Sequence, residues 1–224
     1  MNKNKCTLSV YGIQDRFDFE YPTYVHDHCL ALFDKGMVKN YLQLERHTRI
    51  KHDNKLYQGI CEILRKKKLI AQQNMDVVFV DNVVGSTFLS SNGNIRFEGP
   101  LNRKLSNSIE KGRCWWFDRE MDAYVVNHEL AHIYSCLPFV GNFKENSMLV
   151  HFDGGASKSN FSVWQYNNHT LKLIEYNWDL KYLSSFFNAN ALNFSITGTN
   201  QKEQNSMAGK LMGLAAFGNY NPKL

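Results

Sequence analysis

The sequence has 224 residues, of which 43% are hydrophobic and 21% charged, as in an ordinary folded globular protein. No apolar run is long enough to cross a bilayer, the charged N-terminus lacks the apolar core of a signal peptide, and the five scattered cysteines include no Cys-x-x-Cys pair. These features exclude a transmembrane span and a disulfide framework, so we expect a cytoplasmic protein with reduced thiols and no membrane partner. The net charge of +5 is densest at residues 65–68, where basic side chains complement the end of a predicted helix, and we expect no nucleic-acid partner.

The N-terminal part of the chain has the pattern of strands followed by a helix. Strands are predicted at Cys6–Ile13, Tyr24–Phe33 and Met37–Leu44. The last two are joined by Asp34-Lys35-Gly36, a turn tripeptide whose glycine accepts positive φ. Apolar spacing predicts a helix over Lys55–Leu69, and the continuous apolar run Met75–Val80 predicts a buried parallel strand.

The C-terminal part is predicted to be mostly loop, helix and hairpin. The segment Gly85–Gly112 is rich in Ser, Asn and Gly and is expected to be mostly loop, followed by a helix over Asp118–Cys136 that Pro138 stops. Further elements are expected as a strand at Met148–Phe152, a hairpin of Phe161–Tyr166 and Thr170–Tyr176 around Asn167-Asn168, and a helix at Glu203–Phe217.

A weak internal repeat indicates how these elements are organised. A strand, a turn and a strand follow His26, and the same succession follows Asp153. Two such units with helices between them predict a duplicated α/β fold with a cleft between its halves. We expect the second half to be incomplete, because no further parallel strand is predicted after the last helix.

The sharpest local motif is His128-Glu129-Leu130-Ala131-His132. Residues four apart share one face of a helix, so His128 and His132 can present both imidazoles to one metal ion. The same residues spell the zinc metallopeptidase signature, in which Glu129 would be the general base. The extended form of that signature, with a glycine and a third histidine, is absent.

Two further segments offer groups for a metal or an anion. Asp153 ends the predicted strand Met148–Phe152, where α/β proteins place ligands, and Gly154 and Gly155 after it allow close approach of a phosphate. The densely charged stretch 45–53 follows another strand and is either an anion-binding loop or a solvated loop of offsetting charges. In the first case Arg46, Arg49 and Lys51 are the candidate contacts.

Five segments together resemble, in order along the chain, the motifs of the carbamoyltransferases of nodulation and antibiotic tailoring. His26-Asp27-His28-Cys29 is similar to that family's His-Asp-Ala-Ser, the stretch 44–53 to its Glu-Glu-Arg-Phe-Thr-Arg-x-Lys-His-Asp, His128–His132 to its His-His-x-Ala-His, Asp153-Gly154-Gly155 to its Asp-Gly-x-Gly, and Met212–Gly218 to its Met-Gly-Leu-Ala-x-x-Gly. The departures are His28 and Cys29 in place of small residues, Leu44 in place of a glutamate, and Glu129 in place of the second histidine. These departures bear on the identity of the acceptor more than on metal binding.

The resemblance implies an actin-like ATPase (ribonuclease-H-like) duplicated fold, with a first lobe at residues 1–146 and the start of a second lobe at 147–224. It also implies O-carbamoyl transfer from carbamoyl adenylate to a hydroxyl of a small-molecule acceptor. In the family, a further C-terminal domain makes the adenylate from carbamoyl phosphate and ATP. We therefore expect this chain to be incomplete as an enzyme and inactive by itself.

By motif position, the resemblance makes His128, His132 and Asp153 ligands of Fe²⁺ or another divalent ion such as Zn²⁺. It implies catalytic roles for His26, near the acceptor hydroxyl, and Lys51, near the carbamoyl or phosphate group. Gly154, Gly155 and Arg49 would then contact the nucleotide. Two alternatives stay open: a zinc metallopeptidase built on His128-Glu129-His132, and a non-catalytic, truncated actin-like module that binds a nucleotide.

Overall fold

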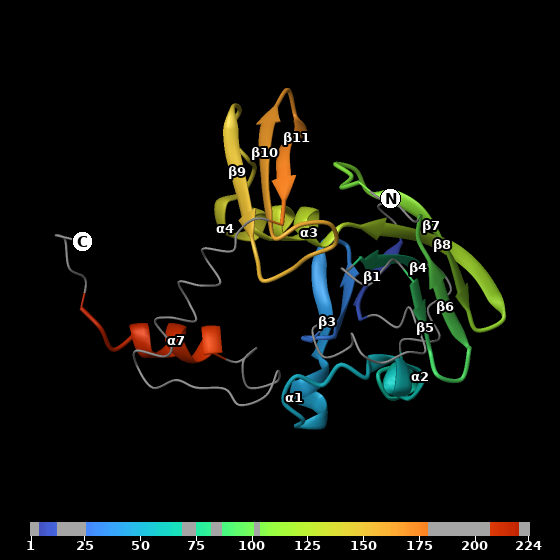
Figure 1. The fold of residues 1–224 in the computed structure, drawn as a ribbon. Coiled ribbons are helices and arrows are strands. Elements are labelled where there is room, and N and C mark those ends of the chain that lie inside the picture. The colour runs from blue at the N-terminus through green and yellow to red at the C-terminus, as the bar shows by residue number, and fades with distance from the viewer. Residues whose placement is uncertain are drawn as a thin grey trace. The chain divides into compact units, whose positions relative to one another are not determined.

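The computed structural model describes residues 5–12, 26–68, 75–81, 87–100, 104–178 and 207–219. The chain divides into two compact units, Met1–Trp178 and Asp179–Leu224. The first unit is a mixed α/β structure with a large curled sheet, a small sheet and few helices (Figure 1). In the second, the described element is helix α7, Met207–Ala215, inside the predicted helix Glu203–Phe217, of which residues 203–206 lie outside the description. The predicted lobe boundary at residue 146 falls within the first unit and stays a prediction.

The large sheet has eight strands in the order β3-β2-β1-β4-β8-β7-β6-β5. They are β1 Cys6–Tyr11, β2 Cys29–Asp34, β3 Met37–Gln43, β4 Met75–Val80, β5 Thr87–Leu89, β6 Ile95–Glu98, β7 Glu110–Trp116 and β8 Arg119–Val126. β4 is parallel to both of its neighbours, β1 and β8, and all other pairs are antiparallel. The predicted parallel strand at Met75–Val80 is therefore confirmed, and it lies in the middle of the sheet.

The first hairpin follows the predicted turn, but its first strand starts later than expected. Lys35 and Gly36 both have positive φ, 49° and 78°, which is the conformation that matches the twist of a two-residue hairpin. β2 begins only at Cys29, so the prediction that His26, Asp27 and His28 lie on a strand is wrong. The reason is local, because Asp27 has φ 61°, which is incompatible with an extended strand.

The predicted loop at 85–112 and the long helix at 118–136 are both wrong in part. Strands β5 and β6, and the start of β7, lie in the first segment, and β8 occupies the first half of the second. β7 and β8 pair across a turn at Phe117, and alternate residues such as Cys114 and Trp116 are buried. Burial against the rest of the sheet outweighs the loop-like composition, and the helix, α3, is confined to His128–Ser135.

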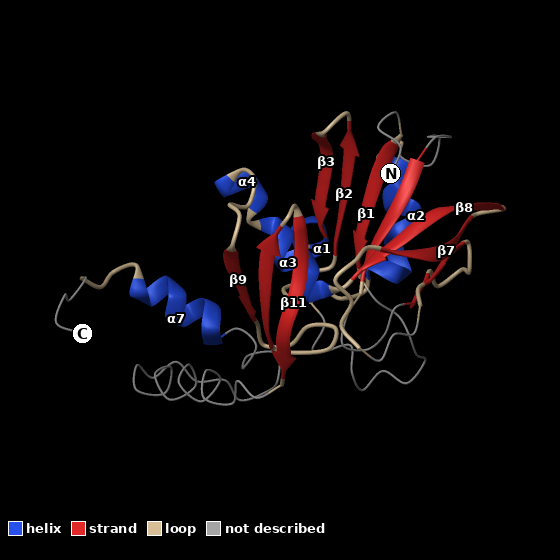
Figure 2. Cartoon of the chain, turned by 90° about the horizontal axis from the view of Figure 1, so that it is seen from above, coloured by secondary structure: helices blue, strands red, loops and turns tan. Residues whose placement is uncertain are grey.

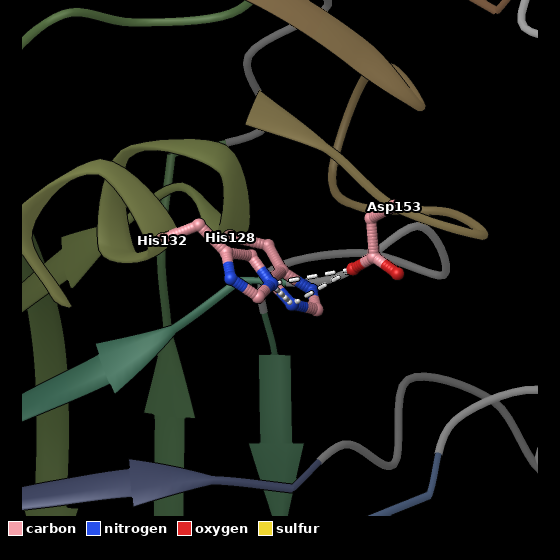
Figure 3. Close-up of side chains that lie close together, drawn as sticks. All are labelled: His128, His132 and Asp153. Atoms are coloured by element: carbon pink, nitrogen blue, oxygen red, sulfur yellow. Dashed lines mark hydrogen bonds and ion pairs between the residues drawn. The ribbon is translucent and has the colours of Figure 1, made fainter. Parts of the chain in front are cut away.

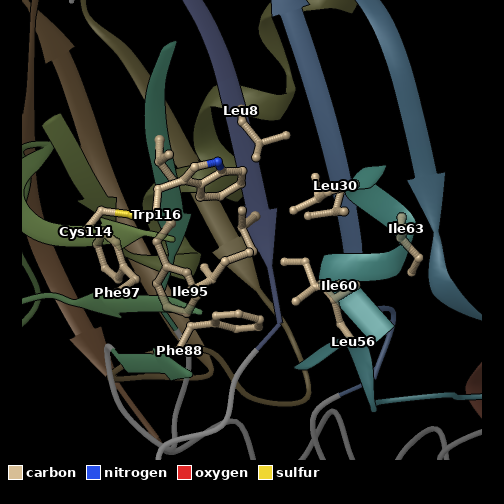
Figure 4. Packing of buried hydrophobic residues seen from close by; sticks show 14 of the residues in the cluster. Leu8, Leu30, Leu56, Ile60, Ile63, Phe88, Ile95, Phe97, Cys114 and Trp116 are labelled. Atoms are coloured by element: carbon tan, nitrogen blue, oxygen red, sulfur yellow. The ribbon is translucent and has the colours of Figure 1, made fainter. Parts of the chain in front are cut away.

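Helix α2, Leu56–Lys66, covers one face of the large sheet and forms its main core. The predicted helix is confirmed, with Leu56, Ile60 and Leu64 fully buried. Figure 4 shows Leu56 and Ile60 on the side of α2 that faces Leu8 and Leu30 of β1 and β2 and the aromatic residues of the neighbouring strands, and Leu64 belongs to the same cluster. The short helices α1, Leu44–Thr48, and α4, Leu137–Val140, follow β3 and α3.

The small sheet has the order β11-β10-β9, and α3 lies between it and the large sheet (Figure 1). β9 is Ser147–Phe152, β10 is Phe161–Asn167 and β11 is Thr170–Asn177, all antiparallel, so the predicted strand and hairpin are confirmed. Apolar residues of α3 pack with Trp164 of β10, and Val78 and Val80 of β4 pack against the same cluster. Because Val77 and Phe79 of β4 belong to the core under α2, β4 is buried on both faces.

Figure 2 shows α3 beside the small sheet and the loops that follow its strands. Among the described residues, none of the helices is both long enough and apolar enough to cross a membrane.

Candidate metal centre

Helix α3 presents two histidines at its N-terminal end. His128 is its first residue and His132 lies one turn later, so both side chains share one face. Their rings stack with centroids 4.7 Å apart and planes 11° apart. The two Nε2 atoms are 2.9 Å from each other. The i,i+4 arrangement predicted from the motif is therefore present on a helix.

Asp153 brings a carboxylate to the same point from the end of β9. Its Oδ2 lies 3.6 Å from Nε2 of His128 and 3.2 Å from Nε2 of His132 (Figure 3). The other oxygen, Oδ1, accepts a hydrogen bond from the backbone N–H of Gly154. The predicted convergence of these three side chains is confirmed.

The three ligand atoms fit one metal ion. A triangle with sides of 2.9, 3.6 and 3.2 Å has a circumscribed radius of about 1.9 Å, shorter than the roughly 2.0–2.2 Å bonds that zinc makes to histidine and carboxylate. One ion can therefore reach all three atoms as they lie. Two imidazoles and one carboxylate are a donor set that non-haem Fe²⁺ and catalytic Zn²⁺ both accept, with positions left for exogenous ligands.

The electrostatics favour the ligating forms of these groups. Burial, with the charge of His132, lowers the pKa of His128 to about 4, so its imidazole is neutral at neutral pH. Burial by itself would raise the pKa of Asp153, but the hydrogen bond with His132 and the charges of both histidines hold it below its ordinary value. A neutral imidazole and an ionised carboxylate are the forms that bind a metal.

Glu129 is the second residue of α3, directly after His128, and its side chain points away from solvent. Its side chain is fully buried, and Oε1 accepts hydrogen bonds from the N–H of Lys158 and the hydroxyl of Ser159. Oε2 accepts a hydrogen bond from the N–H of Ser157. Both carboxylate oxygens are thus occupied by the loop that follows Asp153.

The pKa of His26 is affected by the charge of Asp153. Its Nδ1 is 2.6 Å from Oδ2 of Asp27, and its ring stacks on that of His52 with centroids 4.7 Å apart. The hydrogen bond with Asp27 raises the pKa of His26, and the negative charge of Asp153 acts in the same direction. The charge of Asp153 thus contributes to the pKa of His26 although more than 100 residues separate the two in sequence, and the catalytic role of His26 stays a prediction.

The predicted anion-binding residues are exposed. Arg49 ends α1 with φ 64°, and Lys51 lies in the following turn. In the described ranges, no hydrogen bond or ion pair joins either side chain to His128, His132 or Asp153. Their assignment to the carbamoyl donor and the nucleotide stays a prediction.

The two glycines after Asp153 differ in their surroundings. A Cβ added at Gly154 would meet nothing within 4 Å, whereas one at Gly155 would lie 3.6 Å from the Trp178 ring. Among the described residues, no side chain therefore fills the space beside Gly154. Its assignment to nucleotide binding is likewise untested.

Sequence reasoning missed His151, Ser157 and Ser159. His151 is buried on β9 two residues before Asp153, and its ring centroid is 5.1 Å from that of His132. Its Nε2 has no hydrogen-bond partner in the described ranges. His151 could have been predicted from the sequence, because the spacing His151-x-Asp153 puts it close to Asp153 at the end of a strand. The two serines have no such signal, because their role depends on the approach of α3.

No model of a known protein family matches the sequence, and neither does any curated protein.

Proposed function

We propose that the chain is the metal-binding, actin-like part of an O-carbamoyltransferase, which passes a carbamoyl group from carbamoyl adenylate to a hydroxyl of a small acceptor. The observation that carries the proposal is the meeting of His128, His132 and Asp153, which belong to two separate motifs of the resemblance. A third motif contributes His26, whose pKa responds to the charge of Asp153.

The strand order supports an actin-like fold. In β3-β2-β1-β4-β8, an antiparallel three-stranded meander is followed by two parallel strands, which is the order of a ribonuclease-H-like lobe. β5, β6 and β7 would be an insertion before the last of these strands. The small sheet repeats the meander in the order β11-β10-β9, as the start of a second lobe would.

The residues of the chain suit this chemistry. Asp27, whose pKa is lowered by its hydrogen bond with His26, is an acceptor, so Nδ1 of His26 carries the hydrogen and Nε2 is left as the basic nitrogen. Nε2 would take the proton of the acceptor hydroxyl as its oxygen attacks the carbamoyl carbon and the bond to the adenylate phosphate breaks. Lys51 would offset the negative charge that develops, and Arg49, Gly154 and Gly155 would hold the adenylate.

His128, His132 and Asp153 would hold Fe²⁺ or Zn²⁺, which supplies a Lewis acid for a carbonyl or phosphoryl oxygen.

The contacts of Glu129 argue against the peptidase alternative. A general base needs a free oxygen facing a water, but both oxygens of Glu129 accept hydrogen bonds and the side chain is fully buried.

Titration of the chain with Zn²⁺, or with Fe²⁺ under anaerobic conditions, against a chromophoric chelator tests the metal centre. We expect one ion per chain, and affinity reduced more than about 100-fold by His132→Ala, since loss of a direct ligand should exceed the 10–100-fold effect of outer contacts. His169→Ala is the matched control, because this histidine lies exposed at the turn between β10 and β11. Equal affinities of the two variants would contradict the metal centre.

Binding of a non-hydrolysable carbamoyl-adenylate analogue tests the carbamoyl part separately. We expect the metal-loaded chain to bind the analogue more tightly than the metal-free chain, and Lys51→Ala to weaken binding. No binding by the metal-loaded chain would overturn the assignment of the adenylate contacts to Lys51, Arg49, Gly154 and Gly155 while leaving the metal centre intact. Peptide hydrolysis that Glu129→Gln abolishes would establish the peptidase instead.

A further inference from the structure

Glu129 joins the helix that carries both histidines to the loop that carries Asp153. The N–H of Lys158 donates to its Oε1 at 2.7 Å, the Ser159 hydroxyl donates to the same oxygen at 3.0 Å, and the N–H of Ser157 donates to Oε2 at 3.2 Å. All three donors lie four to six residues after Asp153. Both oxygens of the Glu129 carboxylate are thus hydrogen-bonded to one short stretch of that loop.

A side chain of the same loop also accepts a hydrogen bond from the helix. The backbone N–H of His128, which has no acceptor within the helix because it is in the first turn, donates to Oγ of Ser157 at 2.8 Å. The first residue of α3 and the side chain of the second are therefore both bonded to the same loop. One of the two residues held in this way, His128, is itself a candidate metal ligand.

The loop transmits this constraint to Asp153. The N–H of Asp153 donates to the carbonyl of Asn160 at 2.9 Å, and the N–H of Ala156 donates to the carbonyl of Ser159 at 3.0 Å. The segment from Asp153 to Asn160 is therefore closed on itself, so holding residues 157–159 also holds its first residue. Ala156, Ser157 and Ser159 are all buried, which leaves the segment little room to adjust.

From these contacts we infer that Glu129 is a positioning residue, which sets the Asp153 carboxylate against the two histidines and so determines the affinity of the metal centre. The inference rests on the proposed metal centre but not on carbamoyl transfer. It gives Glu129 a different task from the base of a zinc peptidase. The residue acts through the loop and does not touch the ion.

Glu129→Gln tests this with little change in volume. Glutamine replaces one acceptor oxygen by an NH₂ group, which would face a donor of the loop. We expect the Zn²⁺ affinity of the full chain to fall by about 10–100-fold, and amide hydrogen exchange at Ser157 and Lys158 to become faster. Ser159→Ala removes a single donor and is expected to weaken Zn²⁺ binding less, which keeps the inference testable if Glu129→Gln does not fold.

Glu145→Gln is the matched control. Glu145 also accepts two backbone N–H groups, from Asn168 at 2.8 Å and His169 at 3.3 Å, at the turn between β10 and β11. We expect this variant to exchange faster at its own turn and to keep the wild-type Zn²⁺ affinity within about twofold, since it touches no ligand candidate.

A double-mutant cycle separates positioning from general loss of structure. If Glu129 acts through Asp153, Glu129→Gln should weaken Zn²⁺ binding in the wild-type background and have no further effect in an Asp153→Ala background, where only the two histidines bind. The same loss in both backgrounds, or wild-type affinity in Glu129→Gln, overturns this inference and leaves the metal centre standing. Failure of the wild-type chain to bind any ion overturns both.

Discussion

His28 is a buried imidazole without a hydrogen-bond partner among the described residues, and lowering the pH should reveal the free-energy cost of protonating it. Its side chain is 1% exposed, and neither ring nitrogen forms a hydrogen bond within the part of the chain that the structure describes. Burial lowers its pKa from the ordinary 6.5 to about 4, against the opposing charge of Asp53. The folded state therefore resists a proton that the unfolded state accepts.

The sign and size of the effect follow from these two pKa values. Above pH 6.5 His28 is neutral in both states and its contribution to stability is complete. As the pH falls from 6.5 to 4, the unfolded state is protonated and the folded state is not, so the free energy of unfolding decreases. Over the whole window the loss is about 3 kcal/mol, of which about 2 kcal/mol falls between pH 7 and pH 5.

Urea unfolding of the metal-free chain at pH 7 and at pH 5, followed by circular dichroism, measures this loss. Because burial also lowers the pKa of His128, His52 and His151, the wild-type difference contains more than the titration of His28. His28→Asn and His28→Leu each remove one titration, and we expect each to reduce the difference between the two pH values by about 2 kcal/mol. Their stabilities at pH 7 should differ from one another, since only asparagine is polar.

A pH dependence that neither substitution changes would refute the reasoning, because it would mean that His28 gains its proton equally easily in both states.

Other substitutions test the packing of particular residues. Gly112→Ala should lower the free energy of unfolding by about 1–3 kcal/mol in urea titrations, because its Cβ would lie 2.6 Å from the ring of Phe97 and 2.9 Å from a backbone oxygen. Gly59→Ala should raise it by about 0.5–1 kcal/mol, because the site is helical and its Cβ would meet only ordinary contact at 3.8 Å; a loss of stability would contradict this. Iodoacetamide at pH 8 should label exposed Cys136 and not Cys114, whose pKa burial raises to about 12, with peptide mass spectrometry as the measurement; equal labelling of the two in the folded chain would be inconsistent with this burial.

The elements that the sequence predicted well carry their own burial pattern. The apolar spacing of α2 continues for three turns, and the residues at that spacing, Leu56, Ile60, Ile63 and Leu64, are all buried. β4 is apolar at successive positions because both of its faces are covered. The convergence of the two histidines with Asp153 was predictable from a helix period and a strand end.

The errors arise where distant parts of the chain decide the structure. β7 and β8 look like loop and helix locally, yet β7 pairs with β6, and Cys114 and Trp116 are buried in one core cluster with residues of α2. The contacts of Glu129 need donors 28 to 30 residues further along, and no local pattern indicates them. Local propensity is a weak guide when such long-range contacts compete with it.

The order of the strands along the chain also determines when the central strands of the large sheet can pair during translation. β9, β10 and β11 are contiguous and can pair as soon as they emerge, but β4 must wait for β8, which ends 46 residues after it. At roughly 5–20 residues per second, translation leaves one edge of β4 unpaired for about 2–9 s. An unpaired apolar strand is a template for pairing with other chains. We therefore expect nascent chains that end between β4 and β8 to be the ones that chaperones retain, and translation pauses in that interval to lower the yield of folded protein.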